Sequence, residues 1–250
     1  MHYKWKTEES EGSMLLEVQN LTKFFGGVCA VNGLSFGVND GILGIIGPNG
    51  SGKTTTFNLI AGVYKPTRGV VTFNGKQITG QPSYKVCKLG IARTFQLIKI
   101  FGSMSVFENV LVGATFGRQR SQVTREATLD VLKSTGLADK AESSMSTLTL
   151  LDKKRLEIAR ALATKPRLLM LDEPAGGLSP AEVDDLMRLI REIAKGGVAV
   201  LLIEHVMKAA MGISDRMIVL NEGKKIAEGS PDEVARSQEV IDAYLGEVIA

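Results

Sequence analysis

A short stretch near the start of the chain joins an apolar strand to a helix through a glycine-rich turn. Residues 42–46 read Ile-Leu-Gly-Ile-Ile, which is typical of a buried strand. Residues 47–54 read Gly-Pro-Asn-Gly-Ser-Gly-Lys-Thr, and a helical pattern then runs from about Lys53 to Ala61. A strand that leads directly into a helix in this way indicates an α/β fold, in which helices cover a parallel sheet.

The turn at residues 47–54 fits a phosphate-binding loop at every fixed position and lies in the context that this loop requires. Its glycines let backbone N–H groups point at phosphate oxygens at the positive end of a helix. Lys53 would reach the β- and γ-phosphates, and the Thr54 hydroxyl could ligate Mg²⁺. The alternative is an ordinary glycine-rich turn. We expect the nucleotide to be bound by Gly47, Pro48, Asn49, Gly50, Ser51, Gly52, Lys53, Thr54 and Thr55.

A second apolar strand, residues 168–171, ends in two carboxylates, Asp172 and Glu173. Ligands of an open α/β sheet collect beyond the carboxyl ends of its strands. We therefore expect Asp172 to hold Mg²⁺ and Glu173 to accept a proton from the attacking water. The alternative is a solvated Asp-Glu pair before a turn. Together with the phosphate-binding loop, the pair predicts a nucleoside triphosphatase.

The remaining periodicity predicts one α/β domain with an added β-layer and an inserted helical lobe. Residues 16–38 fall into short apolar runs broken at Gly26-Gly27 and Asn32-Gly33, which predicts antiparallel strands. Strand-helix alternation resumes after residue 165 and indicates a mostly parallel sheet. Helices are expected at 106–113, 125–135, 153–163 and 180–195 and from Ser230 onward, and further strands at 70–73, 91–95, 198–203 and 217–220.

Composition excludes several other classes of protein. The net charge of +3 is too small to indicate a nucleic-acid binder. No run approaches the ~18 apolar residues of a membrane-spanning helix. Two cysteines, Cys29 and Cys87, cannot form a disulfide framework. Residues 1–13 are polar and acidic, so we expect a flexible tail there rather than a secretory signal.

At this point the sequence closely resembles the ATP-binding subunits of ABC transporters, over about residues 15–246. Residues 92–96, Ala-Arg-Thr-Phe-Gln, are similar to the family's Q-loop, which implies that Gln96 lies near the metal and the attacking water. Residues 203–205, Ile-Glu-His, are similar to its switch region, which implies that His205 contacts the γ-phosphate. A histidine at a strand end can instead be a structural group of the core.

Two further segments resemble the family's nucleotide contacts. Phe25, ahead of Gly26-Gly27, is similar to the aromatic residue that stacks on adenine, although it could also pack into the β-layer. Residues 176–179, Gly-Gly-Leu-Ser, are similar to the D-loop that meets a second subunit, although they could be a plain turn. The resemblance thus implies an ABC ATP-binding domain over residues 14–250, with the helical lobe at about 97–165 inserted into its core.

Four phrases point to one branch of the family, the LivG type of branched-chain amino-acid importer. Importers of urea and other polar solutes share many of these sequence motifs, so the solute follows by analogy only. The phrases are residues 92–96, 107–113, 155–162 and 211–216.

The chain departs from the family where it would carry Leu-Ser-Gly-Gly-Gln or, in the branch that it resembles, Leu-Ser-Tyr-Gly-Asp. Residues 148–152 read Leu-Thr-Leu-Leu-Asp, in which Thr149 keeps the hydroxyl that would face the nucleotide. Leu151 replaces a glycine that approaches the γ-phosphate in the opposite subunit, and its side chain could hold that phosphate away. Residues 153–155, Lys-Lys-Arg, follow at an expected helix N-terminus, where the helix dipole disfavours cations unless an anion is close. The alternative is a solvated basic turn.

The resemblance implies an ATPase that uses ATP and Mg²⁺ to power solute import at the cytoplasmic face of the membrane. Its partners would be transmembrane permease subunits, contacted through residues 97–107, and a second ABC subunit in a homo- or heterodimer. A periplasmic or extracellular solute-binding protein would take part indirectly, and no nucleic acid would. Two alternatives remain: a soluble ABC protein of DNA repair or translation, and an ATP-gated regulatory subunit with weak hydrolysis.

Overall fold

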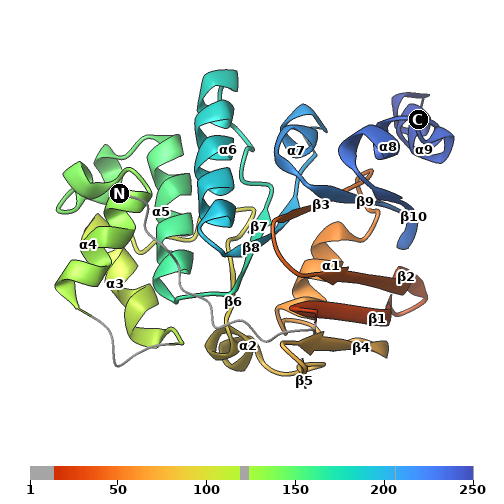
Figure 1. The fold of residues 1–250 in the computed structure, drawn as a ribbon, viewed down its shortest axis with the longest axis horizontal. Coiled ribbons are helices and arrows are strands. Elements are labelled where there is room, and N and C mark those ends of the chain that lie inside the picture. Colours follow the sequence, from red (N-terminus) through yellow and green to blue (C-terminus); the bar gives the residue numbers. More distant parts are fainter. Residues whose placement is uncertain (1–13, 119–123, 206, 250) are drawn as a thin grey trace.

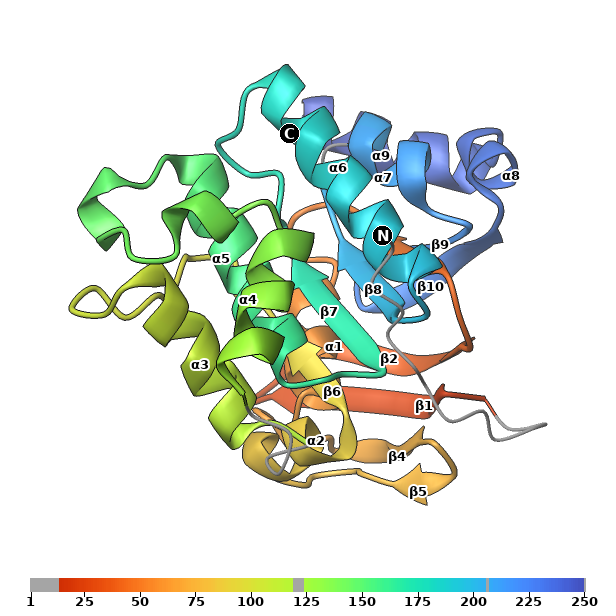
Figure 2. The same ribbon diagram turned by 60° about the vertical axis from the view of Figure 1, so that its left-hand side comes forward.

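The computed structural model of the chain describes residues 14–118, 124–205 and 207–249. Within these ranges the strands form a six-stranded sheet and a four-stranded sheet, and a lobe of helices stands at one side (Figures 1 and 2). This arrangement confirms the expected α/β class, with its added β-layer. The flexible tail expected at residues 1–13 lies outside the described residues.

The four-stranded sheet is the antiparallel β-layer that the sequence predicts. It has the order β2-β1-β4-β5. Its strands are β1 (Leu16–Phe25), β2 (Val28–Val38), β4 (Arg68–Phe73) and β5 (Lys76–Gln77). A turn at Gly26 joins β1 to β2, but the break expected at Asn32-Gly33 is wrong. Those two residues lie inside β2, where the pairing with β1 shifts register and Gly33 takes a positive φ of 63°.

The six-stranded sheet has the order β10-β9-β3-β8-β7-β6. The strands β9, β3, β8, β7 and β6 run parallel to one another. The edge strand β10 pairs antiparallel with β9. The strands are β3 (Ile42–Ile46), β6 (Ile91–Arg93), β7 (Leu168–Asp172), β8 (Ala199–Ile203), β9 (Arg216–Asn221) and β10 (Lys224–Gly229). The carboxyl ends of β3 and β7 therefore open on the same edge, which brings the phosphate-binding loop near Asp172.

Helices cover the six-stranded sheet and build the separate lobe. The sheet carries α1 (Lys53–Ile60), α2 (Ser83–Leu89), α6 (Pro180–Lys195), α7 (Met207–Ile213), α8 (Pro231–Ala235) and α9 (Gln238–Ile249). The lobe contains α3 (Val106–Phe116), α4 (Arg125–Ser134) and α5 (Leu150–Ala163). Helix α6 has the predicted bounds, and Ser230 caps α8 as expected.

Helix α5 begins three residues before the predicted start at residue 153. The Thr149 side chain accepts a hydrogen bond from the Asp152 amide, and the Asp152 carboxylate accepts one from the Thr149 amide. This reciprocal cap satisfies amides that a helix N-terminus leaves without partners. Thr149, expected to contact the nucleotide, is thus also the cap of α5, a role that its position in the sequence did not predict.

The core lies on both faces of the six-stranded sheet, and β7 shows how one strand serves both. Leu169 and Leu171 pack with the lobe and α6. Leu168 and Met170 face the opposite way and pack with the β-layer and α1. Alternate residues of a strand point to opposite faces, so an uninterrupted apolar run is required here.

We expect Leu156→Ala to destabilise the fold by about 2–5 kcal/mol, because Leu156 is fully buried in the cluster that ties α5 to the sheet. Val28→Ala is the control, since Val28 is 68% exposed and its truncation should cost no more than ~0.5 kcal/mol. Urea unfolding of both variants measures the difference. Equal midpoints would mean that α5 contributes little to global stability.

Candidate active site

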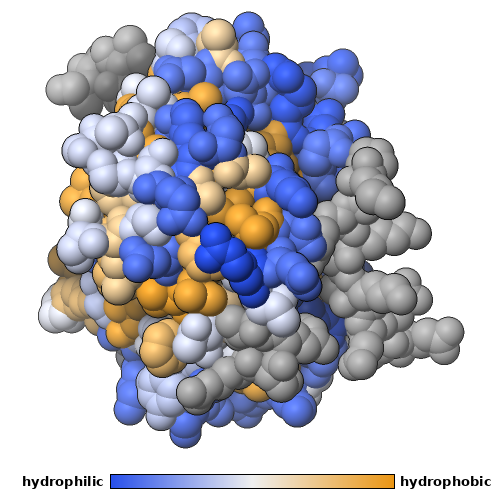
Figure 3. Space-filling view, turned by 90° about the vertical axis from the view of Figure 1, so that its left-hand side faces the viewer, coloured by the Kyte–Doolittle hydropathy of each residue, from blue (hydrophilic) through white to orange (hydrophobic). Residues whose placement is uncertain are grey.

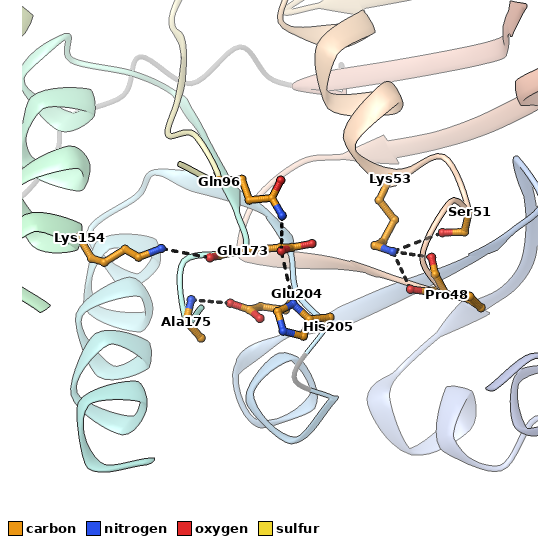
Figure 4. A network of polar contacts seen from close by, with 10 residues as sticks. Pro48, Ser51, Lys53, Gln96, Lys154, Glu173, Ala175, Glu204 and His205 are labelled. Atoms are coloured by element: carbon orange, nitrogen blue, oxygen red, sulfur yellow. Dashed lines mark hydrogen bonds and ion pairs between the residues drawn. The ribbon is translucent and has the colours of Figure 1, made fainter. Parts of the chain in front are cut away.

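The phosphate-binding loop wraps around the end of its own lysine. Lys53 Nζ donates hydrogen bonds to the carbonyl oxygens of Gly47 and Pro48, at 2.6 and 2.7 Å, and lies 3.4 Å from Ser51 Oγ (Figure 4). The lysine is 5% exposed, so these oxygens satisfy an ammonium that water hardly reaches. The loop is therefore ordered around one buried cation.

Two glycines of this loop are required by close backbone neighbours. A Cβ on Gly47 would lie 2.0 Å from the Leu220 carbonyl oxygen, and one on Gly52 would lie 2.4 Å from that of Ala30. Both residues also have positive φ values, 146° and 99°. The spacing that predicts phosphate binding is thus also demanded by the packing of the loop against β9 and β2.

Asp172 ends β7 as a buried carboxylate with one oxygen paired and one not. Its Oδ2 lies 3.5 Å from Arg93 Nη2, and its Oδ1 has no hydrogen-bond partner among the described residues. Burial raises the pKa of Asp172, the Arg93 charge opposes that rise, and Glu173 adds to it. A buried carboxylate oxygen without a partner fits a hard cation such as Mg²⁺, which prefers oxygen ligands.

Glu173 stands at the centre of a polar cluster that gathers three segments of the chain. Its Oε2 accepts a hydrogen bond from Gln96 Nε2 at 2.9 Å and lies 3.5 Å from His205 Nδ1. Figure 4 shows Gln96 and His205 reaching Glu173 from either side. The backbone of Glu173 has a φ of 49°, a sparsely populated conformation for a residue with a Cβ. Such strain concentrates at functional sites.

Lys154 ties this turn to α5. It is 6% exposed, and its Nζ lies 3.4 Å from the Glu173 carbonyl oxygen. The solvated basic turn considered for residues 153–155 is therefore wrong for Lys154. The fully buried Glu204 accepts a hydrogen bond from the Ala175 amide at 2.7 Å, which holds the other side of the turn that follows β7. Neither contact was predictable from local patterns, because its two partners are distant in sequence.

Two expected nucleotide contacts lie apart from this cluster. Phe25 is 43% exposed at the β1–β2 turn, packs edge-on against Tyr64 at 5.3 Å, and has Lys23 Nζ 4.9 Å from its ring centre. The alternative that Phe25 belongs to the core of the β-layer is therefore wrong. The Thr149 hydroxyl is engaged in capping α5, 2.9 Å from Asp152 Oδ2.

The leucines that replace the family's glycines do not behave alike. Leu151 is half-buried and packs against the core of the lobe. Leu150 is 39% exposed, and its Cδ2 would lie 3.2 Å from a Cβ on Gly177. This packing argues against the expectation that Leu151 holds a phosphate away.

A groove of about 680 Å³ runs between α2, residues 91–101, α3 and α5. Phe95, Phe101, Val112 and Phe116 line it with apolar surface, and Phe116 is 68% exposed. The side of the molecule formed by the lobe shows hydrophobic residues gathered within a largely hydrophilic surface (Figure 3). Exposed apolar area of this kind marks interaction sites.

Comparison with known proteins fixes the family. A family model described as "ABC transporter" matches residues 31–176, and one described as "Branched-chain amino acid ATP-binding cassette transporter" matches residues 224–250. The chain belongs to the ABC transporter ATP-binding family. The ABC ATPase is 42% identical to the high-affinity branched-chain amino acid transport ATP-binding protein BraF of Pseudomonas aeruginosa, over 93% of this chain and 98% of the relative. It is 41% identical to LivG of Escherichia coli over the same shares.

Solved structures agree with this assignment. A nucleotide-free ATP-binding cassette from an ABC transporter matches with a TM-score of 0.84 and 30% identity, covering 93% of this chain and 99% of that one. The ADP conformation of another cassette matches with a TM-score of 0.86 and 30% identity, over 94% and 100%. The ABC ATPase thus has the predicted cassette fold and binds nucleotide. None of its described helices combines the length and apolarity needed to cross a membrane.

A buried carboxylate of the ABC ATPase joins residues 91–101, which line the groove, to α5. Glu157 is 3% exposed. Its Oε1 accepts a hydrogen bond from the Lys99 amide at 2.8 Å and lies 3.7 Å from Arg160 Nη2. Burial raises the pKa of Glu157, against the opposing Lys99 amide and neighbouring cations. The sequence motif at residues 155–162 gave no signal that Glu157 would bind a backbone amide, because that amide, of Lys99, is distant in sequence.

The raised pKa of Glu157 predicts a pH-dependent change in stability. As the pH rises above the ordinary value of 4.5, the unfolded chain releases this proton before the folded chain does, so the folded state loses stability. Glu157→Gln removes that loss. The free energy of unfolding of the variant, relative to the unaltered chain, should therefore rise with pH, as measured by urea unfolding between about pH 4 and pH 8.

Glu182→Gln is the control with the opposite sign. Hydrogen bonds from Ser179 lower the pKa of the exposed Glu182, so its contribution is present above the ordinary pKa and lost as the pH falls. The relative stability of this variant should fall as the pH rises. The same trend in both variants would contradict the assignment for Glu157.

Proposed function

We propose that this ABC ATPase hydrolyses Mg²⁺-ATP to drive the import of branched-chain amino acids through a membrane permease. The observation that carries the hydrolytic part is the cluster of Glu173, Gln96 and His205 at the same edge of the sheet as the phosphate-binding loop. The choice of solute is supported by the relatives, several of which are named for branched-chain amino acid transport.

Binding the nucleotide exchanges hydrogen bonds of the loop. Lys53 would release the carbonyl oxygens of Gly47 and Pro48 and turn to the β- and γ-phosphates, while backbone N–H groups of residues 49–52 would donate to phosphate oxygens. The hydroxyls of Thr54 and Thr55, at the start of α1, complete the set. Phe25 would stack on adenine after leaving its contact with Lys23.

Thr54, Gln96 and Asp172 would hold Mg²⁺, whose charge stabilises the phosphoryl oxygens during transfer. Glu173 then accepts the proton of the attacking water, for which a free carboxylate oxygen is needed. Gln96 already donates to Oε2 of Glu173 and orients the carboxylate. His205, 52% exposed on its side chain, would donate to the γ-phosphate.

Three kinds of partner follow from this proposal. A second ABC subunit, identical or different, would face the phosphate-binding loop with its own Thr149-type segment, and the D-loop at residues 176–179 would meet it. Permease subunits would place a cytoplasmic helix in the groove, which supports assignment to the cytoplasmic face of the membrane. An external solute-binding protein would act through the permease. Residues 14–250 would form one ATP-binding domain, with a lobe at about 97–165.

Lys53→Ala should abolish Mg²⁺-dependent ATP binding, whereas Glu173→Gln should preserve binding and abolish turnover. The lysine serves phosphate binding and the glutamate serves proton transfer, a role worth about 10²–10⁴ in rate. Nucleotide fluorescence titration and phosphate release in the assembled transporter measure the two effects. If Glu173→Gln hydrolysed ATP at the rate of the unaltered chain, Glu173 would not be the group that accepts the proton of the attacking water.

Phe116→Glu should weaken co-purification with the permease, because burying an unpaired carboxylate against an apolar helix costs roughly several kcal/mol even after relaxation. Val28→Glu is the matched control, since Val28 and Phe116 are equally exposed, at 68%, and Val28 does not line the groove. Quantitative pull-down with tagged permease measures the difference. Equal losses would show that the groove is not the contact.

A further inference from the structure

Arg93, the last residue of β6, makes contacts in four directions. Its Nη1 donates to Asn58 Oδ1 at 2.7 Å, its Nε donates to the Thr94 carbonyl oxygen at 3.2 Å, and its Nη2 lies 3.5 Å from Asp172 Oδ2. The guanidinium also stacks over the ring of Phe95, 4.7 Å from its centre. The side chain is 13% exposed, so these contacts largely enclose it.

The same side chain lines the groove, together with Phe95 and Phe101. Arg93 therefore belongs to two sites at once: it is one of the residues that line the groove, and its guanidinium pairs with the carboxylate that ends β7. Asn58 adds a link to α1, the helix that follows the phosphate-binding loop.

A guanidinium is planar, and its donors point in fixed directions. Because Nη1 and Nε are held by Asn58 and Thr94, Nη2 has little freedom to leave Asp172. The pairing fixes Oδ2 and leaves Oδ1, which has no partner among the described residues, as the oxygen available to a cation. Partners that orient a ligating carboxylate typically change metal affinity by about 10–100-fold when removed.

We propose that Arg93 is a positioning residue that orients Asp172 toward Mg²⁺ and transmits occupation of the groove to the nucleotide site. The inference rests on the proposed function, in which Asp172 holds the metal and a permease helix fills the groove. A group that displaces Arg93 from the groove side would remove the partner that holds Oδ2 of the carboxylate. Coupling of this kind is reciprocal, so Mg²⁺-ATP must change the affinity of the groove for the permease helix by the same factor.

Arg160 provides a matched control within the same groove. It lines the groove, lies over a phenylalanine ring at 5.5 Å, and pairs with a buried carboxylate at 3.7 Å. Its carboxylate is Glu157, which holds the Lys99 amide and lies outside the Glu173 cluster. Arg93 and Arg160 thus share burial, ring contact and ion pair, and differ in whether the paired carboxylate is Asp172.

The first experiment compares ATP binding by the full chain in Mg²⁺ and in EDTA, using a fluorescent ATP analogue. Arg93→Met should reduce the Mg²⁺-dependent gain in affinity about 10-fold or more and leave binding in EDTA unchanged. Arg93→Lys should restore part of the gain, and Arg160→Met should keep all of it. Asn58→Ala, which spares the arginine but frees its Nη1, should give an intermediate loss.

The outcomes separate the inference from the function on which it rests. An unchanged Mg²⁺ dependence in Arg93→Met would overturn the positioning role, as would an equal loss in Arg160→Met. Failure of the unaltered chain to bind ATP more tightly in Mg²⁺ would instead reject the proposed metal site. If Arg93→Met does not fold by circular dichroism, Arg93→Lys and Asn58→Ala decide the question.

The second experiment reads the groove directly through Cys87, a half-buried free thiol in its wall. In a Cys29→Ser background, the alkylation rate of Cys87 should change when Mg²⁺-ATP is added, and ATP in EDTA should have a smaller effect. Arg93→Met should abolish the difference, whereas Arg160→Met should keep it. A Mg²⁺-ATP response that survives in Arg93→Met, or no response in the Cys29→Ser chain itself, would overturn the transmission of groove occupation.

Discussion

Two neighbouring backbones approach the phosphate-binding loop so closely that side chains are excluded from it. The carbonyl oxygens of Leu220 and Ala30 lie where Cβ atoms on Gly47 and Gly52 would be. Strands β9 and β2 belong to different sheets, so both sheets must be correctly formed before the loop can take its shape. The close approach therefore makes the nucleotide site depend on the packing of the whole molecule, and not only on the residues of the loop.

Buried carboxylates connect the loop region to the lobe. Asp172 pairs with Arg93 and Glu157 lies near Arg160, while Lys154 reaches the Glu173 carbonyl oxygen from α5. Buried ion pairs contribute little net stability, because desolvation offsets attraction, but breaking one leaves an uncompensated charge. Their value here is geometric: they fix the positions of α5 and β6 relative to the turn at Glu173.

The elements with strong local signals were predictable from the sequence. The phosphate-binding loop, the apolar strands β3, β7 and β8, and helix α6 all lie where the periodicity places them. Local patterns gave no signal for β10, whose charged edge sequence lacks an apolar run, or for α2. The roles of Arg93, Lys154 and Glu157 were also not predicted, because each depends on a partner brought close only by the tertiary fold.

The self-contacts of Lys53 have a consequence for the release of product. In the proposed mechanism the lysine would exchange the Gly47 and Pro48 carbonyl oxygens for phosphate, so the gain on binding would be the difference between two well-formed sets of hydrogen bonds. When the γ-phosphate has gone, the carbonyls are at hand to take the ammonium back without leaving it buried and unpaired. The loop itself would thereby compete with ADP for the ammonium, which would weaken the retention of ADP.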